Sequence, residues 1–433
     1  RWGDYTIVAT DPQDPNAAWV GDQYAAGDGT WATTIHELVV GGAGAGYFPL
    51  APVRVLDSRS SSGSPLGFSG VLVANVPRTF AVAGGHGIPS DAIAITGNLS
   101  VTGQTRAGYL ALTPTPTASP SSATLNFPTA DTRGNNTTIA LAPDGSLAVV
   151  YKAPAGAHTN VILDVTGYFS TTGVGARYRP LAGPVRILDT RAGTALGATT
   201  FSANVPKTFL VTGTTIPAGA AAITANLAVV NQTKAGYVTL SPTPDASPTT
   251  STINFPTGDV RANGLTIPVN LDGTVAAVYK APSGTVDLVL DVTGYYSSDV
   301  SGLLFHPLNP GRRVDTRLAA GTDGLGNGLS GAQGTTPRSV VVAGHDGLPA
   351  DAAAITGNLS VTAQTAAGYV AITTSSVLHP TTSTINFPLG DTRGNGITVP
   401  LGTGGDAGKL WFVYQLGSTK HVQLILDITG YFE

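Results

Sequence analysis

Apolar and polar residues alternate with a period of two along most of this chain. Between Ile93 and Thr102, for example, Ile93, Ile95, Gly97, Leu99 and Val101 take one set of alternate positions. Alanine, threonine, asparagine and serine fill the positions between them. This alternation is typical of a β-strand with one face in a core and the other towards water. The segment 161–169 repeats it, and no segment has the spacing of an amphipathic helix, so the pattern predicts an all-β protein.

The whole pattern returns three times. YFPLAPVRVLDSR at 47–59 returns as YRPLAGPVRILDTR at 178–191 and as FHPLNPGRRVDTR at 305–317. Each copy also contains an N-L-[SA]-V segment, an N-F-P segment followed by Asp-x-Arg, and a closing D-[VI]-T-G-Y motif. Because copies spaced by about 130 residues are too long for a solenoid repeat, each copy should be a complete structural unit.

The sequence therefore predicts three tandem β-sandwiches of Greek-key or jelly-roll type, each with about eight strands. They span 47–170 (repeat 1), 178–297 (repeat 2) and 304–433 (repeat 3). The connections between them are short and polar, so we expect three independently folding domains in a semi-rigid row. A glycine-rich linker, GGAGAG at 41–46, separates them from the first 40 residues.

Residues 1–40 do not belong to the repeat. They carry RWGDY at the start, a DPQDP turn and a WATTI strand, and in these features they resemble the last blade of a sialidase-like β-propeller. The repeats, with their R-x-L-D-T-R and D-V-T-G-Y-F motifs, resemble domains found in secreted and surface proteins of high-GC bacteria. The second resemblance implies an extracellular or cell-surface location, and it implies no particular chemistry.

Composition narrows the function classes. The chain has 433 residues, of which 42% are hydrophobic, with 55 glycines and 30 prolines, so it should fold and should be rich in turns. Only 11% of residues are charged, the net charge is −4 and no basic stripe is present, which argues against a nucleic-acid partner. There is no cysteine, so disulfides and thiolate metal sites are excluded. No apolar run approaches the ~18 residues that a membrane span requires.

Charged residues recur at matched positions in the three copies, and they are the first candidate site. Calcium ligands and sugar-binding carboxylates are one interpretation of the aspartates. Because three arginines balance three aspartates in each copy, we favour structural ion pairs and predict no metal or cofactor. The residues are Arg54, Asp57, Arg59, Asp131, Arg133 and Asp164 in repeat 1, Arg186, Asp189, Arg191, Asp259, Arg261 and Asp291 in repeat 2, and Arg312, Asp315, Arg317, Asp391, Arg393 and Asp427 in repeat 3.

Recurring asparagines and tyrosines are the second candidate. Asparagine is disfavoured in strands, so its repetition needs a reason: bonds to turn backbone, or a polar groove that contacts a glycan or a partner protein. Trp411 stands where the other copies have alanine. Its indole ring either fills space in a rearranged core or is exposed and contacts a sugar or a partner chain. The candidate contact residues are Asn98, Tyr109, Asn226, Tyr237, Asn358, Tyr369 and Trp411.

No catalytic motif is recognisable, and the seven histidines do not stand at matched positions. We therefore expect a non-catalytic, extracellular structural or adhesive protein whose partner is a cell-envelope glycan or another copy of itself. Three of the four tryptophans, Trp2, Trp19 and Trp31, lie in the first 40 residues and could mediate end-to-end self-assembly. The alternative is a set of carbohydrate-binding modules attached to a sialidase-like propeller glycosidase.

Overall fold

The structure is a computed structural model that describes residues 6–10, 17–25, 31–39, 44–59, 67–213, 215–318, 333–345, 347–415 and 419–433. It divides into two compact units, Arg1–Gly44 and Ala45–Glu433. Unit 1 thus ends at Gly44, inside the predicted linker 41–46.

Unit 1 contains one antiparallel sheet with the order β1-β2-β3. Its strands are β1 (Thr6–Thr10), β2 (Ala17–Ala25) and β3 (Trp31–Val39). Trp19 lies in β2 and Trp31 in β3, whereas Trp2 falls outside the described residues. The resemblance of this unit to a sialidase-like blade, and its role in assembly, stay predictions.

Unit 2 contains the three repeats. Repeat 1 has β4 (Gly46–Asp57), β5 (Leu72–Val73), β6 (Arg78–Ala81), β7 (Ala92–Thr102), β8 (Gly108–Thr113), β9 (Leu125–Phe127), β10 (Arg133–Ala140), β11 (Ser146–Lys152) and β12 (His158–Ser170). Repeat 2 has β13 (Arg177–Asp189), β14 (Phe201–Ser202), β15 (Lys207–Leu210), β16 (Ala222–Val230), β17 (Gly236–Ser241), β18 (Ile253–Phe255), β19 (Arg261–Pro268), β20 (Thr274–Lys280) and β21 (Thr285–Ser297). Repeat 3 has β22 (Phe305–Asp315), β23 (Arg338–Val341), β24 (Ala354–Thr362), β25 (Gly368–Thr373), β26 (Ile385–Phe387), β27 (Arg393–Pro400), the single-turn helix η1 (Gly404–Asp406), β28 (Lys409–Gln415) and β29 (Gln423–Phe432).

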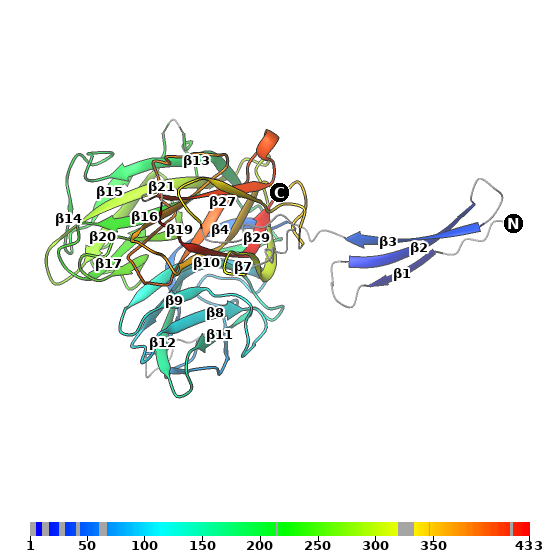
Figure 1. Ribbon diagram of the computed structural model, residues 1–433, viewed down its shortest axis with the longest axis horizontal. Helices are drawn as coiled ribbons and strands as arrows, with labels where there is room; N and C mark the ends of the chain where they lie inside the picture. Colours follow the sequence, from blue (N-terminus) through cyan, green and yellow to red (C-terminus); the bar gives the residue numbers. More distant parts are fainter. Residues whose placement is uncertain are drawn as a thin grey trace. The chain divides into compact units, whose positions relative to one another are not determined.

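Each repeat forms two antiparallel sheets. In repeat 1 the first sheet has the order β10-β7-β12-β4 and the second the order β6-β11-β8-β9, and repeats 2 and 3 have the same two orders. The strands β10, β19 and β27, one from each repeat, contact one another in the middle of unit 2 (Figure 1). The six sheets are the six blades of a complete β-propeller.

The expected all-β class is confirmed. The prediction of three separate β-sandwiches after a short propeller stub is wrong. Strand β7 explains the error. The sequence pattern places Thr96, Asn98 and Ser100 on a solvent face, yet they are 0%, 5% and 2% exposed. Strand β19 of repeat 2 packs against β7, and Asn98 is bonded to Asn263 of β19 and to the backbone oxygen of Ser251. The polar face of β7 is therefore an interface between blades. The three repeats accordingly belong to one compact unit and do not form a row of separate domains.

Three apolar cores lie within the repeats, each between the two sheets of one repeat. A fourth core joins all three repeats and is mainly aromatic. In it the first aromatic residue of each repeat meets the last aromatic residue of another, with ring centroids 4.3–4.5 Å apart. The pairs are Tyr47 with Tyr296, Phe305 with Phe169, and Tyr178 with Phe432.

This fourth core accounts for the T-G-Y motif that closes each repeat. A Cβ atom on Gly167 would stand 2.3 Å from the ring of Tyr47, and one on Gly430 would stand 2.3 Å from the ring of Phe305. A Cβ atom on Gly294 would stand 2.5 Å from the ring of Tyr178. Glycine is therefore required where the closing strand passes over the aromatic ring of the opening strand.

Candidate functional site

The Asp-x-Arg motifs of the three repeats meet at one place and form a closed ring of ion pairs. Each arginine binds the aspartate two residues before it and the equivalent aspartate of a neighbouring repeat, with N–O distances of 2.6–2.8 Å. The arginine side chains are 3% exposed and the aspartates 14–15%. The ring consists, in order, of Arg133, Asp131, Arg261, Asp259, Arg393 and Asp391.

Asparagines form a second connection between the repeats. Asn135 donates from Nδ2 to Oδ1 of Asn358 at 2.8 Å, and its own Oδ1 accepts the backbone N–H of Gly396 at 2.6 Å. Asn263 binds Asn98 in the same way, and Asn395 binds Asn226. The amide groups of Asn98 and Asn226 also donate to the backbone of the next repeat, to Ser251 and Ser383 at 2.7 Å.

The asparagines predicted as glycan or partner contacts therefore have their polar atoms occupied inside the protein. Asn98, Asn226 and Asn358 are 5–7% exposed, so little of their surface is open to a ligand. Sequence reasoning singled out Arg133 but missed Asn135 two residues later, although asparagine recurs at that spacing in every copy as Asn263 and Asn395.

The R-x-L-D-T-R motif forms a second group of charges on each first sheet. Arg54 binds Asp164 at 2.8 Å and Asp57 at 3.1 Å, and Arg59 binds Asp57 at 2.7 Å. Repeats 2 and 3 have the same three pairs among Arg186, Asp189, Arg191 and Asp291 and among Arg312, Asp315, Arg317 and Asp427. The second carboxylate oxygen of Asp164 accepts the backbone N–H of Ser251 in repeat 2 at 3.1 Å.

These carboxylates differ in their proton affinity. The hydrogen bond from Arg59 lowers the pKa of Asp57, and that from Arg191 lowers the pKa of Asp189. Burial raises the pKa of Asp164, Asp291 and Asp427, although an arginine partner acts in the opposite direction. The aspartates of both groups are thus paired with guanidinium groups, and nowhere in the described ranges do three or more acidic or histidine side chains cluster as metal ligands would.

The recurring tyrosines lie at the junctions between repeats and remain partly exposed. Tyr109 of repeat 1 faces Arg312 and Asp427 of repeat 3, and Tyr237 of repeat 2 is close to Arg54 and Asp164 of repeat 1. Trp411 is half-buried in β28, opposite Ser339 and Thr373, where Ala148 and Ala276 of the other repeats are buried. Its indole N–H is buried and has no hydrogen-bond partner among the described residues.

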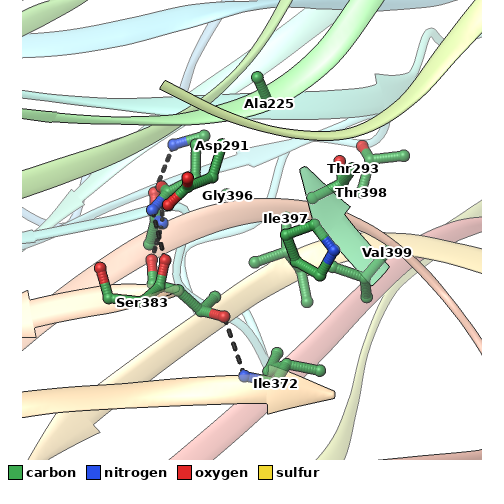
Figure 2. Close-up of a pocket in the computed structure, with 14 residues that line it drawn as sticks. Ala225, Asp291, Thr293, Ile372, Ser383, Gly396, Ile397, Thr398 and Val399 are labelled. Carbon is green, nitrogen blue, oxygen red and sulfur yellow. Dashed lines mark hydrogen bonds between the residues drawn. The ribbon is translucent and has the colours of Figure 1, made fainter. Parts of the chain in front are cut away.

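Cavities also lie at these junctions. Figure 2 shows a small one between repeats 2 and 3, with Asp291 and Thr293 from repeat 2 and Ser383 and Val399 from repeat 3 around it. Its volume of about 30 Å³ suits a single water molecule. A pocket of about 290 Å³ lies beside it, and a cleft of about 350 Å³ lies between repeats 1 and 3.

No family model and no curated protein matches the chain. Among the described residues, no helix has the length and apolarity to cross a membrane.

Proposed function

We propose that this chain is a non-catalytic extracellular protein with a structural or adhesive role, in which unit 2 is a rigid body. One observation supports this proposal above the others. The charged residues that recur in the repeats are paired with one another, and the ring at the centre uses them to join the repeats. A catalytic acid or base must be free to reach substrate, whereas the recurring aspartates are each held by at least one arginine, and each of the ring arginines is held by two aspartates.

The propeller fold is found in both enzymes and binding proteins, so the fold alone does not decide between them. The extracellular location is supported by the absence of cysteine and the low content of charged residues. The proposed partners are a cell-envelope glycan or a second copy of the chain.

Unit 1 is the proposed region of self-association. Its strand β3 pairs with β2 along one side, and Ile7, Val8 and Ile35 are 64–70% exposed. Since Ile7 and Val8 are consecutive residues of a strand, they point to opposite faces of the sheet, and apolar side chains on both faces favour a covering partner.

Two measurements on the full chain test the proposal. Sedimentation with purified bacterial envelopes measures binding to envelope material, and analytical ultracentrifugation of the protein alone measures self-association. We expect at least one of them to be positive. A chain that stays in the supernatant and is monomeric at high concentration would contradict the proposed role.

Deletion of residues 1–44 then separates the contributions of the two units. The cut must not pass Gly44, because Ala45 is 2% exposed and its backbone N–H donates to Phe305 at 2.8 Å. If unit 1 mediates self-association, the truncated chain should be a folded monomer that keeps any binding to the envelope.

A further inference from the structure

The cleft between repeats 1 and 3 differs from the filled contacts at the centre of the molecule. It has a volume of about 350 Å³, enough for one sugar unit, and is lined from both sides. Tyr109, Pro120 and Ser121 of repeat 1 form one wall, and Arg312, Arg317 and Thr362 of repeat 3 contribute to the other.

Two arginines and one aspartate, Arg312, Arg317 and Asp427, line this cleft, and the guanidinium groups are more exposed than the carboxylates. The side chains of Arg312 and Arg317 are 30% and 45% exposed, whereas those of Asp315 and Asp427 are 1% and 2% exposed. The carboxylates therefore lie behind the guanidinium groups and orient them. Arg317 is held by Asp315 through Nε at 2.7 Å and through Nη2. A guanidinium fixed in this way is a preorganised donor to a ligand carboxylate.

The uncharged walls of the cleft suit a sugar ring. The ring of Tyr109 and the side chain of Pro120 supply apolar surface, which packs on the C–H face of a saccharide. Ser121 and Thr362 line the same cleft. Their hydroxyl groups already contact the backbone oxygen of Pro310 at 3.5 Å and Thr392 Oγ1 at 2.8 Å, and each oxygen keeps a lone pair that can accept a hydrogen bond from a sugar hydroxyl. We propose that the cleft at Tyr109 and Arg317 binds a carboxylate-bearing saccharide, such as a uronic-acid unit of a polymer.

The corresponding junction between repeats 2 and 3 provides a built-in comparison. There, Arg191 is held by Asp189 at 2.7 Å and is 44% exposed, nearly as Arg317 is. Val230 and Val260 stand where repeat 3 has Thr362 and Thr392, and Arg186 donates from Nη2 to the backbone oxygen of Thr381 at 3.1 Å. Arg186 thus uses part of its guanidinium group on the opposite wall. The walls of the cleft between repeats 1 and 3 are joined by other groups, from Ser121 Oγ to the backbone oxygen of Pro310 at 3.5 Å and from the backbone N–H of Ala123 to Asp427 at 3.2 Å. Because of its engaged arginine and its two valines, we expect the junction between repeats 2 and 3 not to bind the saccharide.

The test is isothermal titration of the full chain with trigalacturonate, and with a neutral galactose trisaccharide as the uncharged probe. We expect trigalacturonate to bind and the neutral sugar to bind at least about tenfold more weakly, because one charge-assisted hydrogen bond contributes about a factor of ten in affinity. Arg317→Gln should weaken trigalacturonate binding about tenfold, and Tyr109→Ala should also weaken it. The matched variants Arg191→Gln and Tyr369→Ala should leave it within about twofold.

Thermal melting of the four variants shows whether each is folded, and each pair should melt alike because its members replace equivalent contacts. Equal binding of the charged and neutral sugars, or equal effects of Arg317→Gln and Arg191→Gln, would overturn the proposal. Displacement of trigalacturonate by millimolar inorganic phosphate would also overturn it, since it would indicate a site for any anion.

The inference rests on the proposed adhesive function, in which the saccharide is part of an envelope polymer. The two can fail separately. If the chain sediments with envelopes but Arg317→Gln sediments equally well, only this cleft is excluded. If the chain binds trigalacturonate through Arg317 but neither sediments with envelopes nor self-associates, the cleft remains and the adhesive role is excluded.

Discussion

An arginine removed from water loses much of its hydration, and it keeps its charge at acceptable cost only where carboxylates replace that hydration. Arg133, Arg261 and Arg393 each meet this requirement with two aspartates, one of them from another repeat. By contrast, the outer arginines, such as Arg59, are about half exposed and bind an aspartate of their own repeat. The same residue type therefore contributes very differently to stability at the two positions.

Arg261→Met tests this difference. The substitution keeps most of the side-chain volume but leaves Asp131 and Asp259 with one guanidinium partner each at a site where the arginine was 3% exposed. We expect unit 2 to lose about 3 kcal/mol of unfolding free energy, measured by urea denaturation. Arg59→Met is the control, since its side chain is 47% exposed and such a pair contributes about 0–1 kcal/mol. Equal losses for the two variants would mean that the ring has no special role.

At the scale of single strands, the alternating pattern predicted where a strand lies but not which part of the molecule packs on its two faces. The segment Ile93–Thr102 was expected to be a strand and is one, since β7 spans Ala92–Thr102. Its burial on the second face could not be predicted, because threonine, serine and asparagine on a strand normally indicate solvent. Here Thr96 and Ser100 bond to polar side chains of their own repeat, and Asn98 bonds to Ser251 and Asn263 of repeat 2. The recurrence of Asn98 as Asn226 and Asn358 was the available signal for a buried polar interface.

The outer strand of each first sheet in unit 2 is poorly suited to pairing with another chain. Each first sheet ends in β4, β13 or β22, and each of these strands contains two prolines. Proline cannot donate a backbone hydrogen bond, so such an edge pairs poorly with another chain. Strand β3 of unit 1 contains none. Strand addition is therefore expected at β3 of unit 1 rather than at these three outer strands.

The central strands β10, β19 and β27 approach so closely that a methyl group cannot fit between them. A Cβ atom on Gly264 would stand 1.8 Å from the backbone oxygen of Gly396. We expect Gly264→Ala to lower the unfolding free energy of unit 2 by about 3 kcal/mol, because the backbones must separate and the asparagine bonds at the centre must lengthen. Gly213→Ala is the control, since a Cβ atom on Gly213 would have no other atom within 4 Å. Comparable melting of the two variants would show that the centre is loosely packed.

At the scale of the whole molecule, the three repeats are related by an approximate threefold arrangement. Each repeat gives one arginine and one aspartate to the ring, one asparagine pair to the centre and two aromatic residues to the fourth core. The contact of repeat 3 with repeat 1 is therefore of the same kind as the contacts between repeats that are adjacent in sequence. Since no linker joins repeat 3 directly to repeat 1, non-covalent contacts alone hold that junction.

It follows that the linkers should not be needed to keep the repeats together. Val174 and Val300 lie in the two linkers and are 90% and 70% exposed, so a specific protease site beside each can be cut in the folded protein. After cleavage at both sites, we expect the three fragments to elute together in gel filtration at the position of the uncut chain. In denaturant the fragments should separate. The linkers raise the effective concentration of each repeat around the others. Because the buried contacts between repeats are large, we expect the repeats to stay together at micromolar protein without this effect. Introducing Arg261→Met into the cleavable chain should make the fragments come apart at higher protein concentration than without it, because repeat 2 would then lose its ion pair to Asp131. Fragments that separate immediately after cleavage would show that the contacts between repeats are weak and that covalent connection holds the propeller closed.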